Sequence, residues 1–240
     1  MQETILTFKR YEKKYLLSAR KFELLWERLR EHLVPDLFHR STVCSIYYDS
    51  DDFSLIRHSL EKPVYKEKLR LRSYNVPGPD GEVFVELKKK YKGVVYKRRV
   101  RMSAVEAERY LAGQSRPPED GQILREIDFF LQTHEVSPKA FIACEREAWV
   151  DREEPELRIT FDRNLRWRDS DLHLSSGSGG EPLLPDGEVL MEIKIPGAAP
   201  LWLAHLLSEL EIFPTSFSKY GTCYRQDLLE KYFNGVIVCV

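Results

Sequence analysis

The sequence predicts an α+β fold: an eight-stranded antiparallel β-barrel with surrounding helices. Eight segments show the two-residue alternation of strands, and five repeat apolar residues with the period of helices. Turn signals, of which residues 77–81 (PGPDG) are the strongest, separate several of the strands. Seven of the eight strands place charged residues on one face, and a sheet that closes can turn that face towards its interior.

The predicted strands are rich in Val, Ile, Tyr and Phe, and they cover residues 5–16, 42–49, 63–74, 82–91, 94–102, 139–150, 156–163 and 188–195. The predicted helices have apolar faces, and they cover residues 18–32, 103–112, 121–134, 200–210 and 219–233. Ser18, Ser103 and Pro200 are typical helix starts. The chain has no internal repeat, and the strand after its longest loop completes the pattern. We therefore expect residues 1–240 to form a single domain.

The composition excludes several classes of protein. Hydrophobic residues make up 42% of the 240 residues, enough for a packed core. No apolar run approaches the ~18 residues of a membrane helix, and the N-terminus lacks a signal layout, so we expect a cytoplasmic protein without a membrane segment. The four cysteines and six histidines show no zinc-type spacing. A net charge of −1 excludes a wholly basic surface but not a concentrated basic site, and we do not expect a nucleic-acid partner.

The charged faces of the strands are biased towards one sign. Their basic residues are Arg10, Lys14, Lys66, Lys68, Arg70, Arg72, Lys88, Lys97, Arg99, Arg146, Arg158 and Lys194. Their acidic residues are Glu12, Glu86 and Glu192. A solvated sheet face is the plain alternative, but such faces usually mix signs because like charges on neighbouring strands repel. Nuclear targeting or nucleic-acid binding is a second alternative for the runs at 88–90 and 97–99, although alternation splits their side chains between two faces.

A closed sheet with this lining cannot have a dry interior, because unpaired buried charges cost too much. It has to hold water and a polyanion. Rows of Lys and Arg suit phosphate, to which Arg offers paired hydrogen bonds. The three carboxylates could hold a divalent cation that bridges phosphate oxygens.

Several short stretches together resemble the VTC catalytic domain, the polyphosphate polymerase branch of the triphosphate tunnel metalloenzymes (the CYTH-like group). They run in family order: RYEKKY (10–15), IYYD (46–49), KLRLRSY (68–74), VELK (85–88), YKRR (96–99), ER (145–146), LRITFD (157–162), MEIK (191–194) and FSKY (217–220). The resemblance implies a tunnel of eight antiparallel strands that binds triphosphate or polyphosphate with Mn²⁺ or Mg²⁺. It also implies that ATP is the substrate.

The positions that match the motifs of the family imply roles for individual residues. As catalytic residues we expect Arg70, Arg72, Lys88, Arg146 and Lys219. As further phosphate-binding residues we expect Arg10, Lys14, Lys68, Lys97, Arg99, Arg158, Lys194 and Ser218. Glu192 corresponds to the metal ligand of the family, and Glu86 and Glu12 are additional candidates on the charged faces.

The first strand departs from the pattern of the hydrolytic tunnel enzymes, which begin with E-x-E-x-K. Here the motif reads Arg10-x-Glu12-x-Lys14, which favours a polymerase and leaves the number of metal ions open. Three functions follow: an ATP-dependent polyphosphate polymerase, a triphosphatase that hydrolyses short polyphosphate or nucleotide, and a non-catalytic module that binds polyphosphate or RNA. A membrane or regulatory partner is also an expectation.

Overall fold

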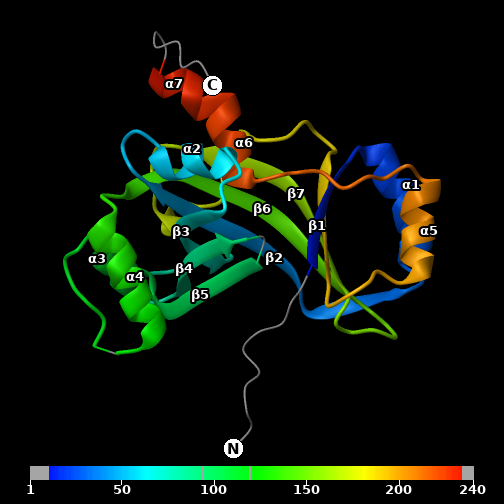
Figure 1. The fold of residues 1–240 in the computed structure, drawn as a ribbon, viewed down its shortest axis with the longest axis horizontal. Helices are drawn as coiled ribbons and strands as arrows, with labels where there is room; N and C mark the ends of the chain where they lie inside the picture. Colours follow the sequence, from blue (N-terminus) through cyan, green and yellow to red (C-terminus); the bar gives the residue numbers. More distant parts are fainter. Residues whose placement is uncertain (1–10, 93, 119, 234–240) are drawn as a thin grey trace, which may run out of the picture. The chain divides into compact units, whose positions relative to one another are not determined.

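The computed structural model describes residues 11–92, 94–118 and 120–233 (Figure 1). Its strands are β1 (Tyr11–Leu17), β2 (Leu33–Asp49), β3 (Tyr65–Tyr74), β4 (Glu82–Tyr91), β5 (Val94–Ser103), β6 (Ser137–Asp151), β7 (Arg158–Arg168), β8 (Glu181–Pro182) and β9 (Val189–Ile195). Its α-helices are α1 (Ala19–Leu29), α2 (Ser54–Leu60), α3 (Ala104–Leu111), α4 (Gln122–Thr133), α5 (Leu201–Glu209), α6 (Lys219–Cys223) and α7 (Leu229–Phe233). A 3₁₀ turn η1 (Leu174–Ser176) and a π-helical turn η2 (Tyr224–Leu228) complete the elements.

The strands form one sheet in the order β1-β9-β7-β6-β2-β3-β4-β5, and β8 pairs with β7. The ladders with a defined register are antiparallel. The predicted α+β fold with an antiparallel sheet is therefore confirmed. Closure into an eight-stranded barrel is not confirmed: the sheet has nine strands because the two-residue β8 adds to β7, and no ladder of the described residues joins β1 to β5.

The chain divides into two compact units, and each is built from separate stretches of sequence. The first contains the described residues of Met1–Ser41, Cys144–Leu165 and Leu184–Phe217, and the second those of Thr42–Ala143, Arg166–Leu183 and Ser218–Val240. Three strands, β2, β6 and β7, run from one unit into the other. The single domain expected over residues 1–240 stays a prediction.

In the second unit, strand alternation separates an apolar face from a charged one. Leu69, Leu71 and Val85 are fully buried in a core that α3 and α4 help to cover. Figure 1 shows these two helices beside β4 and β5. Arg70 and Glu86, at the intervening positions, point to the other face of the strands. The sequence pattern therefore sets which face of this part of the sheet carries charge.

The first unit has its own apolar core, made by α1, α5 and the inner faces of β1, β7 and β9. The side chain of Ser18 accepts a hydrogen bond from the Lys21 backbone N–H at 3.3 Å and caps α1, as predicted. Leu25 and Leu29, one turn apart, are fully buried on the inner side of this helix. Helices α1 and α5 lie side by side (Figure 1).

Several elements differ from the prediction, among them β8, which was not expected, and β7, which extends to Arg168. Strand β2 begins at Leu33 rather than near residue 42, and α2 was not predicted. The last predicted helix is divided into α6, η2 and α7, because the π-helical turn interrupts it. The predicted start of the first strand, residues 5–10, lies outside the described residues. Among the described residues, none of the helices has the length and apolar character needed to cross a membrane.

Candidate functional site

The predicted site residues that the structure describes form two groups, each within one unit. We call the first the Glu86 cluster, which consists of Glu86 with Arg70, Arg72 and Lys97 in the second unit. We call the other the Glu192 cluster, which consists of Glu192 with Glu12, Lys14, Lys194 and Arg146 in the first unit. Arg10 lies outside the described residues.

The Glu86 cluster is built on the β3–β4–β5 ladders, in which Arg70 pairs with Glu86. The Nε and Nη2 atoms of Arg70 lie 2.7 and 2.6 Å from Oε2 of Glu86. Lys97 Nζ lies 2.6 Å from the other carboxylate oxygen, and Arg72 Nε lies 3.9 Å from Oε2. The Glu86 side chain is 1% exposed, so one buried carboxylate holds three cations in place.

These charges shift the pKa values of the cluster. Burial acts to raise the pKa of Glu86, but the positive charges of Arg70, Arg72 and Lys97 outweigh it and lower the pKa to about 2. Burial lowers the pKa of Lys97 to about 8; Glu86 opposes this shift, and the repulsion of the two arginines adds to it. The carboxylate is therefore ionised at neutral pH, and the cluster holds more positive than negative charge.

We predict that Glu86→Gln makes stability less sensitive to acid. A carboxyl whose pKa is lowered on folding stabilises the protein above its unfolded pKa, and that contribution is lost as the pH falls through the folded value. For Glu86 this window runs from 4.5 down to about 2. Urea unfolding at a series of pH values should show a smaller loss of free energy in this window for Glu86→Gln than for the wild type. Glu192 acts in the same direction, so the loss shrinks without vanishing; equal losses in the two proteins would contradict the prediction.

Lysines extend the basic face beside the Glu86 cluster. Lys68, Lys88 and Lys97 occupy adjacent register positions on β3, β4 and β5. Lys68 Nζ donates to Ser218 Oγ at 3.1 Å, and Ser218 in turn accepts from the Gly221 backbone N–H and caps α6. The helix start that carries Ser218 is thus tied to the basic face of β3.

Two more predicted residues lie near this face. Arg99 is the register partner of Glu86 on β5, and its guanidinium lies over the Phe84 ring, 4.7 Å from the ring centroid. Lys219, the first residue of α6, contributes to the positive potential at the Tyr47 hydroxyl. The structure therefore brings together every second-unit residue predicted for phosphate binding or catalysis.

The Glu192 cluster lies on the paired strands β1 and β9, where Lys14 and Glu192 are register partners. Lys194 Nζ lies 2.6 Å and Lys14 Nζ 3.8 Å from the Glu192 carboxylate. Lys14 also lies 3.4 Å from Glu12 and donates to the Phe217 carbonyl at 3.2 Å. Burial acts to raise the pKa of Glu192, but the charges of Lys194, Lys14 and Arg146 lower it well below its usual range.

Two predicted arginines of the first unit are paired with carboxylates that sequence analysis did not place in the site. Arg146 binds Asp162 through two hydrogen bonds of 2.6 and 2.7 Å, and Asp162 is 2% exposed. Arg158 Nε lies 2.9 Å from Asp36. The alternation of β7 places Asp162 on the same face as Arg158 and Thr160, and this is the signal that could have added it to the charged face.

The second strand, β2, contributes polar groups to the charged face that were also missed. Ser45 and Tyr47 are the register partners of Arg72 and Arg70. Arg72 Nε donates to Ser45 Oγ at 3.2 Å, and Arg70 Nη1 to the Tyr47 hydroxyl at 3.4 Å. The alternation of Ser45 and Tyr47 with apolar neighbours is the signal that could have found them, because both occupy the same face of the strand.

The carboxylates fit a divalent cation only in a limited way. Among the described residues, no three side chains of the usual ligand types cluster closely enough to hold a metal ion. Glu12 and Glu192 nevertheless share Lys14, and the buried Thr160 hydroxyl, opposite Glu192 on β7, has no hydrogen-bond partner among the described residues. One or two carboxylates together with phosphate oxygens are a common Mg²⁺ site, and this set fits that description. Glu86 contacts three cationic side chains, and its role as a metal ligand stays a prediction.

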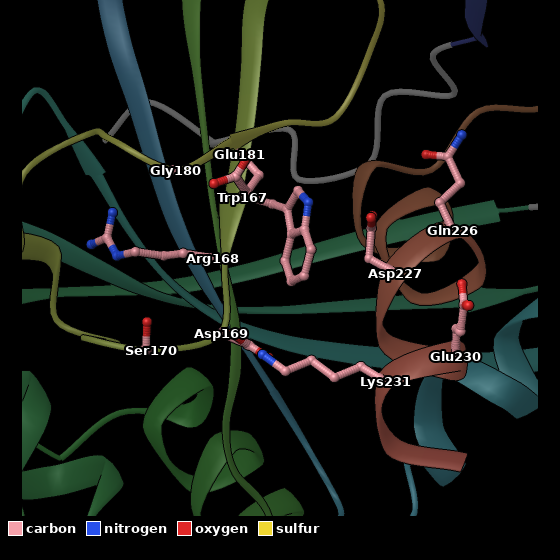
Figure 2. Close-up of a pocket in the computed structure, with 10 residues that line it drawn as sticks. All are labelled: Trp167, Arg168, Asp169, Ser170, Gly180, Glu181, Gln226, Asp227, Glu230 and Lys231. Carbon is pink, nitrogen blue, oxygen red and sulfur yellow. The ribbon is translucent and has the colours of Figure 1, made fainter. Parts of the chain in front are cut away.

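A groove of about 590 Å³ in the second unit lies apart from the predicted residues. Figure 2 shows that residues of β7, the loop that leads to β8, η2 and α7 line it, and that Lys231 extends towards Asp169. The two side chains form an ion pair of 2.5 Å. Asp227, Glu230 and Glu181 also line the groove, so its wall is largely acidic and unsuited to a polyanion.

The α+β fold and the two charge clusters define a protein whose antiparallel sheet carries a cationic face. The chain belongs to the VTC domain family, whose sequence model matches residues 9–226. No curated protein matches the chain in a sequence search.

Solved structures show weaker likeness. The chain is similar to a "putative adenylate cyclase" from Vibrio parahaemolyticus (12% identity, 89% of this chain and 96% of that chain covered, TM-score 0.47). It is also similar to the PH1819 protein of Pyrococcus horikoshii (16% identity, 92% and 99% covered, TM-score 0.43). At these TM-scores the likenesses carry no argument about activity.

Proposed function

We propose that this protein is an ATP-dependent polyphosphate polymerase, which transfers the γ-phosphate of ATP to a growing polyphosphate chain. The observation that carries the proposal is the Glu86 cluster, in which a single carboxylate orders two arginines and a lysine. The surplus positive charge, extended by Lys68 and Lys88, suits a ligand with several adjacent phosphates. Membership of the VTC domain family supports the same class of substrate.

Phosphoryl transfer asks the protein for positioning and charge neutralisation more than for covalent chemistry. We propose that Arg70, Arg72, Lys88, Arg146 and Lys219 bind the phosphoryl oxygens. An oxygen of the terminal phosphate of the polymer then forms a bond to the γ-phosphorus of ATP, while the bond between that phosphorus and the β–γ bridging oxygen breaks and ADP leaves. Preorganised cations stabilise this transition state because their charges are already in place.

A divalent cation, Mn²⁺ or Mg²⁺, would be held by Glu192 and Glu12 and would neutralise charge on the phosphate oxygens. Lys14 and Lys194 balance these carboxylates in the structure. We propose that phosphate oxygens bind these two lysines and Arg158, which leaves the carboxylate oxygens to the cation. A cytoplasmic location and a membrane or regulatory partner remain proposals as well.

Purified protein incubated with ATP and Mn²⁺ tests the function. The polymerase predicts ADP and a long polymer that is resolved on a gel; a triphosphatase would release orthophosphate; a non-catalytic binder would show no turnover and salt-dependent affinity. Either of the last two outcomes would overturn the proposal in favour of the corresponding alternative.

Neighbouring lysines on β4 provide a matched pair of variants. Lys88→Ala should strongly reduce polymer formation because Lys88 lies on the charged face. Lys89→Ala should leave it near the wild-type rate, because Lys89 points to the opposite face and pairs with Glu126 at 3.2 Å and Glu67 at 3.7 Å. Equal effects of the two substitutions would argue against the charged face as the site.

A further inference from the structure

A pair of stacked tyrosines adjoins the Glu86 cluster. The rings of Tyr47 on β2 and Tyr220 on α6 are 4.8 Å apart at an angle of 11°. Both side chains are almost fully buried, at 6% and 2% exposed. Their position is therefore fixed by packing, and neither ring is open for a ligand to stack on.

Asp49 fixes the far end of this pair. It is fully buried and accepts hydrogen bonds from the Tyr220 hydroxyl and from the backbone N–H groups of Leu55, Ile56 and Ser50, all at 2.9–3.0 Å. Two of these N–H groups belong to α2, so the same carboxylate caps that helix and holds Tyr220. The Tyr220 ring in turn supports the ring of Tyr47.

The hydroxyl of Tyr47 meets the charged face. It accepts from Arg70 Nη1 at 3.4 Å, whereas Glu86 accepts from Nε and pairs with Nη2 of the same guanidinium. Guanidinium has five N–H groups, and among the described residues these contacts use three, which leaves one hydrogen on each Nη for a ligand oxygen. Tyr47 therefore holds the edge of Arg70 that Glu86 does not reach.

The groups that face Tyr47 are cationic. They are Arg70 and Arg72 on β3 and Lys219 on α6. The ring of Tyr220 stacks on the ring of Tyr47, and Glu86 contacts Arg70. Burial acts to raise the pKa of Tyr47, but these three positive charges outweigh it and the pKa is lowered. The hydroxyl of Tyr47 is thus more acidic here than in an ordinary tyrosine, because the three cations stabilise its ionised form.

We propose that Tyr47 is a positioning residue, which orients the Arg70 guanidinium towards a polyphosphate ligand and is itself held in place by Tyr220 and Asp49. This role rests on the proposed function, since it requires Arg70 to bind phosphate. It adds a neutral side chain, which the charge pattern of the strands did not identify, to the phosphate-binding face.

Calorimetric titration of the full chain with inorganic tripolyphosphate tests the role. Tyr47→Phe keeps the ring and loses the hydroxyl, and it should bind about three- to tenfold more weakly, as expected for the loss of one long hydrogen bond that orients Arg70. Tyr48→Phe is the matched control, because Tyr48 is equally buried but packs in the apolar core on the opposite face of β2. It should bind like the wild type, and urea unfolding should confirm that both variants are folded.

The near-ultraviolet absorbance of tyrosinate gives a second readout, which a purely structural role would not change. During an alkaline titration one tyrosine of the wild type should ionise before the others, and this early step should be absent only from Tyr47→Phe. Bound tripolyphosphate should move the step to higher pH, because it brings negative charge to Arg70.

The outcomes separate the two proposals. A wild-type protein that binds no tripolyphosphate would overturn the proposed function and the role of Tyr47 with it. A wild-type protein that binds, with equal affinities for Tyr47→Phe and Tyr48→Phe, would overturn the role of Tyr47 alone.

Discussion

Replacing Arg70 with alanine is expected to abolish polymer formation and to weaken tripolyphosphate binding by about ten- to a hundredfold, as expected for lost hydrogen bonds to a charged ligand. The protein should remain folded. Without Arg70, Glu86 keeps Lys97 at 2.6 Å and Arg72 at 3.9 Å, so the buried carboxylate is not left unpaired. A polymerase assay and a calorimetric titration, each paired with an unfolding curve, would measure the effects.

Two further variants sharpen this test. Arg28→Ala removes an exposed arginine whose only ion pair among the described contacts is with Glu209 on α5, and it should change neither activity nor affinity. Arg70→Lys keeps the charge but loses the planar fork that binds both Glu86 and Tyr47, so its affinity should fall between those of Arg70→Ala and the wild type. Wild-type activity in Arg70→Ala would refute the assignment of the Glu86 cluster.

Which face a side chain occupies could be predicted from the sequence, because the period of a strand is a local property. Leu69, Arg70 and Leu71 alternate between core and charged face as expected. The partner of each charge could not be predicted in the same way. The pairing of Arg70 with Glu86 depends on the β3–β4 register, which the turn and the whole ladder set together.

The two side chains that hold Tyr47 in place, Tyr220 and Asp49, could not be predicted for another reason. Helix α2 has only seven residues, and Phe53 at its start provides no side-chain cap. Its cap is Asp49, which comes from the preceding strand and which the sequence suggested only as a strand end. The charge pattern of the strands also does not single out β2, whose contribution to the charged face is the hydroxyl of Ser45 and the phenol of Tyr47.

The largest difference between a predicted and an observed element is the start of β2, and it has a comparable cause. Residues 33–41 contain a proline and several polar side chains, which argue against a strand within a sheet. In the structure this stretch is the first half of β2, and it carries Asp36, the partner of Arg158. The part of β2 whose sequence resembles a loop thus contains Asp36, the carboxylate that pairs with the predicted phosphate-binding residue Arg158.

Replacing Asp162 with alanine is expected to lower the free energy of unfolding by about 3–5 kcal/mol, the usual cost of leaving one member of a buried ion pair alone. The side chains of Arg146 and Asp162 are 14% and 2% exposed and are joined by two short hydrogen bonds. Burial disfavours the charge on Arg146, but Asp162 keeps its pKa well above the ordinary value. Arginine cannot release its proton to relieve the loss, so the variant has to bury an uncompensated charge. Chemical denaturation at neutral pH would measure the difference.

The comparison variant is Glu209→Ala, which breaks the ion pair between Glu209 and Arg28, two side chains that are more than half exposed. It should cost less than about 1 kcal/mol because water solvates the charge that remains. Replacing Arg146 and Asp162 together with methionine and leucine should recover most of the stability lost in Asp162→Ala, since no buried charge is then left without a partner. If Asp162→Ala were no more destabilising than Glu209→Ala, Asp162 would not be the group that keeps Arg146 charged and in position, and the neighbouring Glu192 would have to supply that role.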